Sequence, residues 1–284
     1  MSRGEFRAWH WKGEKILPCS GNIPLADRGF RYGEHVFESI ATREGKFLLA
    51  DEHLALLGEA ARRQELKFSR GLAAGLRRFF SKMKLEDGML RIYLTAGPGA
   101  PGEPVKKSPC YLTWEAVRFP TQVELIKGFS LRSLKKPAEG ATWGEKSGNY
   151  AAHLHALREA RGLGADEAVV FDTQGRILSC SMGNLLIWMK SPHPSGSPVL
   201  CTPPASIGAR RGALLSWVTR HTRVEEREFR KKDLGCALAL AVTNSRLGVM
   251  PVAQCDGKEP PNFSLSINLA REYLRYASTT PGER

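Results

Sequence analysis

No stretch of this 284-residue sequence approaches the roughly 18 consecutive apolar residues that a membrane-spanning helix requires. The N-terminus, MSRGEFRAWHWKGEKILP, also lacks an apolar segment of signal-peptide length. These two absences predict a soluble, cytoplasmic protein. The six cysteines are scattered, with no CxxC pair and no histidine at ligand spacing, which argues against a disulfide framework and a zinc site. We therefore expect reduced cysteines and no bound metal.

The sequence also has little that is typical of a nucleic-acid-binding protein, although its net charge is +13. That charge indicates an anionic partner, either a nucleic acid or small phosphates and carboxylates. The basic residues form short clusters such as Arg210-Arg211, and no basic stripe alternates with aromatic residues. We therefore expect small acidic molecules rather than nucleic acid. Hydrophobic residues make up 42% of the chain, enough for buried cores in one large domain or two smaller ones.

Hairpin and helix patterns fill the first part of the chain. FRAWHW and KILP flank a KGE turn, and VFESIAT and FLL flank a REGK turn, so both pairs predict hairpins. Two helices are expected next, HLALLGEAARRQEL with Asp51 as its N-cap and GLAAGLRRFFSKMKL with Ser69 as its N-cap. The strands MLRIYLTAG and YLTWEAV complete a small domain over residues 1–118, followed by a linker at 119–122.

Residues 123–284 predict a larger domain with further strands, among them EAVVFD, NLLIWM and LALAVTN. A helix is expected directly after Lys146, with Ser147 in its first turn and an apolar stripe of Tyr150, Leu154 and Leu157. An ammonium group that is partly desolvated near the positive end of a helix has its neutral form favoured. A neutral amine attacks carbonyl carbons, so Lys146 suits an aldehyde cofactor. The alternative is an ordinary solvated lysine.

A second candidate site lies at Gly208, Ala209 and Arg210, where the helix ARRGALLSWVTRHT is expected to begin. Backbone N–H groups at a helix start bind phosphate, and arginine side chains supply counter-charges. The turn Thr243–Arg246 follows an apolar strand and offers hydroxyl groups and another cation. Each motif alone is equally compatible with an ordinary helix start or surface turn.

In their order along the chain, these motifs resemble the class IV aminotransferase family of fold-type IV pyridoxal-phosphate enzymes. That family includes branched-chain and D-amino-acid aminotransferases and aminodeoxychorismate lyase. The matching pieces are DRGFRYGEHVFESI, DEHLALL, KSGNY, EARGLGADEAVVFDTQGRIL, SMGNLLIW, TPP, GARR and TNSRLGVMPV. The resemblance implies a two-domain α+β fold with a β-barrel-like core in the larger domain. It also implies a homodimer, and pyridoxal 5'-phosphate bound in the interdomain cleft.

The resemblance further implies roles for individual residues. Lys146 would bind the cofactor covalently, and Tyr150 would bond its phenolic oxygen. The residues that match the phosphate-binding walls are Gly208, Ala209, Arg210, Ser245 and Arg246. The residues that match the substrate pocket or stand beside it are Tyr32, Phe37 and Glu38. The alternative for the two aromatic residues is packing against a hairpin.

Two positions depart from the family pattern. The motif histidine-x-x-arginine-leucine reads HLALL here, so Leu56 replaces the arginine that grips the cofactor phosphate. Losing such a contact costs roughly a few kcal/mol unless Arg210 or Arg246 replaces it. Counting back from Asn184, Ser179 stands where a glutamate normally keeps the pyridine nitrogen protonated. A serine can only hydrogen-bond to a neutral ring, which predicts slower transamination.

The leading interpretation is an aminotransferase that moves an amino group between an amino acid and a 2-oxo acid. One alternative is an aminodeoxychorismate lyase-like enzyme that releases pyruvate, which TNSRLGVMPV and the position of Asn149, three residues after Lys146, favour. Against a D-amino-acid enzyme, Glu103 stands where the substrate carboxylate would be bound. A second alternative is a non-catalytic member of the family, because Leu56 and Ser179 both replace charged residues.

Overall fold

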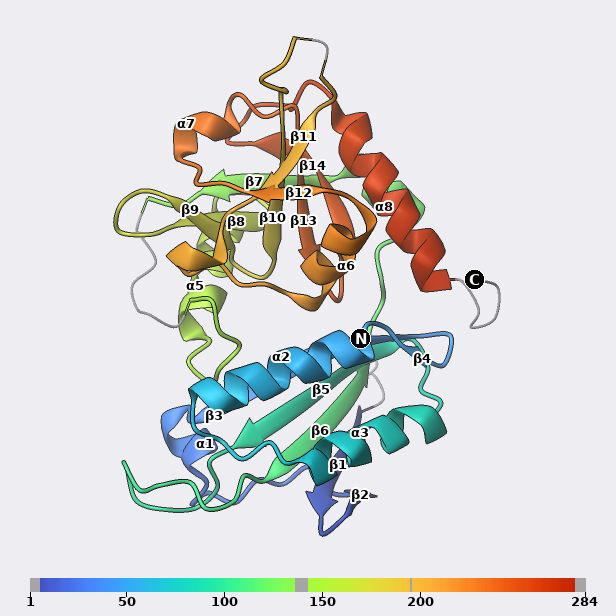
Figure 1. The fold of residues 1–284 in the computed structure, drawn as a ribbon, viewed down its shortest axis with the longest axis vertical. Coiled ribbons are helices and arrows are strands. Elements are labelled where there is room, and N and C mark those ends of the chain that lie inside the picture. Colours follow the sequence, from blue (N-terminus) through green and yellow to red (C-terminus); the bar gives the residue numbers. More distant parts are fainter. Residues whose placement is uncertain (1–5, 136–142, 195, 279–284) are drawn as a thin grey trace. The chain divides into compact units, whose positions relative to one another are not determined.

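The computed structural model describes residues 6–135, 143–194 and 196–278, which form two compact units. The first unit extends to Phe119 and includes Glu145–Asn149, and the second contains Pro120–Gly144 and the chain from Tyr150 onward. Each unit combines one sheet with several helices, which confirms the predicted α+β class (Figure 1). No helix in these described ranges is both long and apolar enough to cross a membrane.

The first unit is built on a six-stranded sheet in the order β2-β1-β6-β5-β3-β4. Its strands are β1 (Phe6–Lys12), β2 (Lys15–Pro18), β3 (His35–Arg43), β4 (Lys46–Phe47), β5 (Gly88–Thr95) and β6 (Cys110–Ala116). These described strands all pair antiparallel. The pairs β1–β2 and β3–β4 are the two hairpins that the sequence predicted.

Helices α2 (Ala50–Arg63) and α3 (Arg70–Lys82) cover one face of this sheet (Figure 1). Alternate strand residues such as Ile40 and Ile92 meet the helices in a shared apolar core. Ser69 caps α3 as predicted, because its hydroxyl accepts a hydrogen bond from the amide of Leu72 at 3.1 Å. The prediction of Asp51 as the cap of α2 was wrong. That helix begins at Ala50, two residues earlier than an Asp51 cap implies, and its cap position is Leu49.

The second unit is built on an eight-stranded sheet in the order β12-β11-β10-β13-β14-β7-β8-β9. Its strands are β7 (Phe129–Ser133), β8 (Glu167–Phe171), β9 (Ile177–Cys180), β10 (Asn184–Met189), β11 (Val199–Thr202), β12 (Val224–Glu226), β13 (Ala239–Asn244) and β14 (Gly248–Cys255). The sheet curls around a core to which most of its strands contribute, among them Leu185 and Val242. This half-barrel is the barrel-like core that the sequence led us to expect.

The helical segments of the second unit are α4 (Gln122–Lys127), α5 (Ala151–Gly162), η1 (Ala205–Ile207), α6 (Ala213–His221), α7 (Lys231–Leu234) and α8 (Phe263–Ser278). The long helix α8 packs on β13 and β14 (Figure 1). Helix α5 packs through its small buried residues against β8, in a separate apolar cluster. The polypeptide directly before α5 and α6 carries five of the predicted site residues, which are Lys146, Tyr150, Gly208, Ala209 and Arg210.

Two predicted helices begin later than expected. Helix α5 starts at Ala151, and its buried residues are His153, Ala156 and Ala160, whereas Leu154 of the predicted stripe is 42% exposed. Helix α6 starts at Ala213 with Gly212 at its cap position. The segments that precede these helices bind to strands instead, and those tertiary contacts prevent earlier helix formation.

Candidate active site

Lys146 lies on an extended segment that pairs with strand β3 in the first unit. Its carbonyl accepts a hydrogen bond from the amide of Phe37 at 2.9 Å. The next residue, Ser147, forms an antiparallel bridge with Val36 and is 1% exposed. Lys146 is therefore not directly at the start of a helix as predicted, because α5 begins at Ala151.

Gly148 holds the end of this segment against the turn between α1 (Arg28–Tyr32) and β3. Its amide donates to the carbonyl of His35 at 2.9 Å. A Cβ atom at this glycine would lie only 2.4 Å from the carbonyl oxygen of Gly33. Helix α1 ends at Gly33, whose φ of 70° is in the left-handed region that favours glycine. Two glycines thus allow two backbones to meet beside Lys146.

The Lys146 side chain is 19% exposed and points to a buried acidic residue. Its Nζ lies 3.7 Å from Oε2 of Glu38 and 5.8 Å from the centre of the Phe37 ring. The same carboxylate oxygen lies 2.8 Å from Nδ1 of His53 on α2. Glu38 and His53 are almost fully buried, at 1% and 2% exposure. The fold therefore brings an amine, a carboxylate and an imidazole together.

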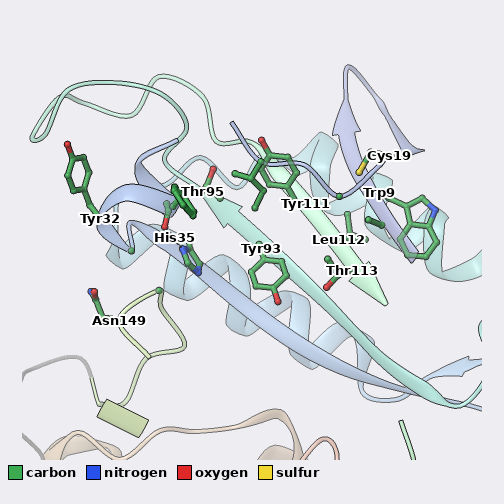
Figure 2. A pocket seen from close by; sticks show the side chains of 17 residues that line it. Trp9, Cys19, Tyr32, His35, Tyr93, Thr95, Tyr111, Leu112, Thr113 and Asn149 are labelled. Atoms are coloured by element: carbon green, nitrogen blue, oxygen red, sulfur yellow. Dashed lines mark hydrogen bonds between the residues drawn. The ribbon is translucent and has the colours of Figure 1, made fainter. Parts of the chain in front are cut away.

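The predicted pocket residues occupy different faces of β3. The ring of Phe37 stacks on Tyr93 of β5, with ring centres 5.9 Å apart. Glu38 points to the opposite face, toward α2, because successive strand residues alternate. Tyr32 lines a pocket of about 480 Å³ in the first unit, together with His35 and Asn149 (Figure 2). The residues that line this pocket do not include Phe37 or Glu38.

In the second unit, the predicted phosphate-binding loop is tied to the sheet. Asn184 opens β10 and pairs with Thr243 of β13. The Asn184 amide donates to the carbonyl of Arg210, and its oxygen accepts from the amide of Gly212 at 3.3 Å. Gly208 has a φ of 97°, and its carbonyl oxygen would lie 2.7 Å from a Cβ at Gly144.

The turn after β13 is the second predicted wall. The side-chain oxygen of Asn244 accepts from the amides of Arg246 at 3.0 Å and Leu247 at 2.8 Å. Its amide donates to the carbonyl of Met182 at 3.1 Å. The hydroxyl of Thr243 is buried and has no hydrogen-bond partner among the described residues. Because Asn184 and Thr243 are cross-strand partners, the two predicted walls begin at neighbouring positions of the sheet.

Ser179 is engaged in hydrogen bonds within the second unit. Its hydroxyl donates to the carbonyl of Cys180 at 2.7 Å and accepts from the indole N–H of Trp143 at 3.0 Å. A hydroxyl has one proton, so this arrangement leaves none to donate to a neutral pyridine nitrogen. The Trp143 ring stacks on His153 at 4.0 Å between ring centres, and His153 stacks on Tyr150 at 4.3 Å. Trp143 and His153 thus connect Ser179 to Tyr150.

The structure adds Glu167, which the sequence analysis did not single out. Its carboxylate is 2% exposed and accepts hydrogen bonds from the amides of Ala168 at 2.8 Å and Ser181 at 3.1 Å, and from the Ser181 hydroxyl. Burial raises the pKa of Glu167 above its usual value despite these donors. Its signal in the sequence was a single acidic residue opening the apolar run EAVVF. His53 was likewise treated only as part of a motif.

The sequence model of the family described as amino-transferase class IV matches residues 35–255. This chain belongs to the class IV aminotransferase family. Members of that family are pyridoxal-phosphate-dependent aminotransferases or aminodeoxychorismate lyases. The match spans β3 to β14 and so includes all three residues of the Lys146–Glu38–His53 cluster. The resemblance proposed from the sequence motifs is confirmed.

The class IV chain is similar to a bifunctional aminodeoxychorismate lyase / D-amino acid transaminase of Mycobacterium tuberculosis. The two are 25% identical over 277 residues, which cover 89% of this chain and 93% of that protein. Two solved structures share the fold. A branched-chain amino acid aminotransferase of Escherichia coli has a TM-score of 0.80 at 18% identity, covering 99% of this chain and 97% of that one. A 4-amino-4-deoxychorismate lyase of Pseudomonas aeruginosa has a TM-score of 0.76 at 23% identity, covering 91% and 96%.

Proposed function

We propose that this class IV chain is a pyridoxal-phosphate-dependent aminotransferase that moves an amino group between an amino acid and a 2-oxo acid. Lys146 binds the aldehyde of the cofactor. The observation that carries this proposal is the setting of the Lys146 amine, which lies on a backbone fixed to β3 and 3.7 Å from the buried carboxylate of Glu38. A solvated surface lysine has no such setting.

The residues of this chain fit the cofactor at its aldehyde and at its phosphate. Lys146 supplies the amine. For the phosphate, Thr243 supplies a buried hydroxyl that has no partner within the described residues. Positive charge comes from Arg246 in the same turn and from Arg210 in the loop bound to the neighbouring strand. The fit is weaker at the ring nitrogen, where Ser179 carries no charge and its proton is already donated to a carbonyl.

When bound, pyridoxal 5'-phosphate supplies an electron sink for negative charge at the substrate Cα. Lys146 would hold the cofactor through its amine, and the same amine would move the proton away from Cα as a general base and acid. Tyr150, whose ring stacks on His153 with ring centres 4.3 Å apart, would orient the cofactor ring. Because Ser179 is uncharged, it does not hold the ring nitrogen protonated, and we expect slow transamination.

We also propose that the enzyme works as a homodimer. The first unit exposes a set of large apolar side chains that a single copy leaves in water. These residues are Phe6, Leu17, Ile23, Leu25, Phe30 and Tyr32. Tyr32 also lines the pocket that contains His35 and Asn149, so a partner that covers this surface would help to close that pocket. Sedimentation of the purified protein at several concentrations tests this part of the proposal.

The decisive experiment is to add pyridoxal 5'-phosphate to purified protein and record the visible absorption. We expect a band that borohydride bleaches, with the label found by mass spectrometry on Lys146. Lys146→Ala should abolish the band, whereas the exposed Lys190→Ala is a matched control that should keep it. Absence of a band in the wild-type protein would favour the alternative of a non-catalytic family member. A band that persists in Lys146→Ala would refute the role of this lysine.

An aminodeoxychorismate lyase-like reaction remains the second candidate, favoured by the similarity to the bifunctional lyase and transaminase of Mycobacterium tuberculosis. The two reactions differ in their need for an amino acceptor. Given an amino donor without a 2-oxo acid, a transaminase stops after one turnover. A lyase given aminodeoxychorismate keeps releasing pyruvate. Pyruvate release in excess of the enzyme concentration would therefore establish the lyase reaction.

A further inference from the structure

Glu38 occupies a position in β3 that the strand pattern reserves for apolar residues. Val36 and Ile40, two residues to either side, are fully buried and face α2. Glu38 pairs in register with Ile92 of β5 and is itself 1% exposed. A charged carboxylate in such surroundings is strongly destabilising unless it is paired and hydrogen-bonded. Its partners should therefore explain its presence.

His53 and Lys146 both lie close to the same carboxylate oxygen of Glu38. The His53 contact, at 2.8 Å, has the length of a hydrogen bond, and the Lys146 contact, at 3.7 Å, has the length of an ion pair. Another carboxylate nearby in the chain, Glu145, is directed elsewhere, because it binds Arg63 at 3.0 Å and Gln64 at 2.8 Å on α2. Its side chain is also ten times more exposed, at 20% against 2%.

Another titratable group of the first unit beside this segment is His35. Its Nδ1 lies 3.0 Å from the carbonyl oxygen of Gly29, and its ring lies against Gly148 rather than Glu38. Glu38 is therefore the buried acidic group that faces the amine from β3, and His53 is the group that supports it from α2. An opposite charge within about 4 to 6 Å favours the charged form of an ionisable group.

We propose that Glu38 is the counter-ion that stabilises the ammonium form of Lys146, and that His53 is a positioning residue that keeps Glu38 charged and directed at that amine. This inference rests on the proposed function of Lys146. When the substrate C–H bond breaks, the proton bonds to Nζ and the electron pair stays on the substrate carbon. The positive charge that forms on Nζ is balanced by the Glu38 carboxylate. Glu38 thus makes Lys146 a stronger base.

The test measures how the acetylation of the Lys146 amine depends on pH. It uses cofactor-free protein, so the result does not depend on cofactor chemistry. Competitive acetylation over a range of pH, read by mass spectrometry of the peptide that contains Lys146, gives the pH midpoint of its reactivity. In Glu38→Gln we expect this midpoint to move to lower pH by about one to three units. Below both midpoints, each unit corresponds to a roughly tenfold faster reaction at fixed pH. The matched control, Glu145→Gln, removes the same charge and should produce a clearly smaller shift.

Variants of His53 provide an independent arm in case Glu38→Gln folds poorly, which near-ultraviolet circular dichroism would reveal. His53→Phe removes the hydrogen bond to Glu38 and should shift the midpoint in the same direction. His53→Gln keeps an N–H donor and should shift it less. An unchanged midpoint in Glu38→Gln, or a shift equal to that of Glu145→Gln, would overturn the inference. If the midpoint shifts but no visible band forms with pyridoxal 5'-phosphate, the counter-ion stands and the proposed cofactor fails.

Discussion

Replacing Gly148 by alanine is the sharpest test of how Lys146 is held. The new Cβ would lie 2.4 Å from the carbonyl oxygen of Gly33 and 2.6 Å from its Cα. Real Cβ contacts essentially never fall below 3.0 Å, so at least 0.6 Å of movement (3.0 − 2.4) is required. Both Gly33 atoms belong to the backbone, which cannot rotate away as a side-chain tip can. The segment carrying Lys146 must therefore shift from β3.

The expected cost of this substitution is about 1–3 kcal/mol of folding free energy, the usual range for overpacking. The amides of Phe37 and Gly148, which bind across this junction at 2.9 Å each, should lose protection against hydrogen exchange. A displacement approaching 1 Å near a reacting group can lower the rate by about 100-fold. Urea unfolding and hydrogen-exchange mass spectrometry measure the first two effects, and single-turnover kinetics measures the third.

Gly162→Ala is the matched control, because a Cβ at the end of α5 meets no atom within 4 Å. It should leave Lys146 unaffected and stabilise the chain by up to about 1 kcal/mol, through reduced backbone entropy. If Gly148→Ala unfolds at the wild-type urea concentration and keeps the exchange protection of Phe37, the close backbone contact does not position Lys146.

Three further predictions concern other parts of the chain. Trp143→Phe keeps an aromatic ring beside His153 but removes the N–H bond to Ser179, so it should lower the free energy of unfolding by about 1 kcal/mol; no change in urea unfolding would contradict the role of that bond. Burial raises the pKa of Glu167 above 4.5 in the folded state, so its contribution to stability is complete below 4.5 and is lost as the pH rises through the folded-state pKa. Glu167→Gln should flatten this part of the stability–pH curve. An unchanged curve would show that Glu167 does not cause this pH dependence. Burial also raises the pKa of Cys110 to about 12, whereas Cys236 is exposed, so a thiol reagent should label Cys236 rapidly and Cys236→Ser should remove that fast phase.

Local patterns in the sequence were sufficient to predict much of the fold. The hairpins and the Ser69 cap depend on neighbouring residues, so turn chemistry and alternation identify them. The starts of α5 and α6 depend on distant contacts instead. The bridge between Ser147 and Val36 delays α5, and the side chain of Asn184 holds the loop before α6. The helix propensities of neighbouring residues therefore cannot predict where α5 and α6 begin.

In the candidate site, too, some features depend on neighbouring residues and others on distant contacts. Motif order singled out Lys146 as a candidate without any structure, because the surrounding residues KSGNY are adjacent in the sequence. The assignment of Phe37 and Glu38 to the substrate pocket stays a prediction, to which the alternation of strand residues adds one constraint. Adjacent strand residues point to opposite faces, so only one of the two could face the same side as Tyr93. His53 could not be found as a partner of Glu38 until the packing of α2 on β3 was known.

One departure from the family pattern, the uncharged Ser179, can be connected to the proposed role of Glu38. An uncharged Ser179 makes the cofactor ring a weaker electron sink, which makes the substrate Cα–H bond harder to ionise. The rate of proton transfer depends on the base as well as on the acid, so a stronger base offsets part of that loss. A buried carboxylate 3.7 Å from the Lys146 amine acts in this direction. Removing Glu38 should therefore impair proton transfer more in this chain than in a variant carrying Ser179→Glu, because the restored electron sink would then reduce the demand on the base.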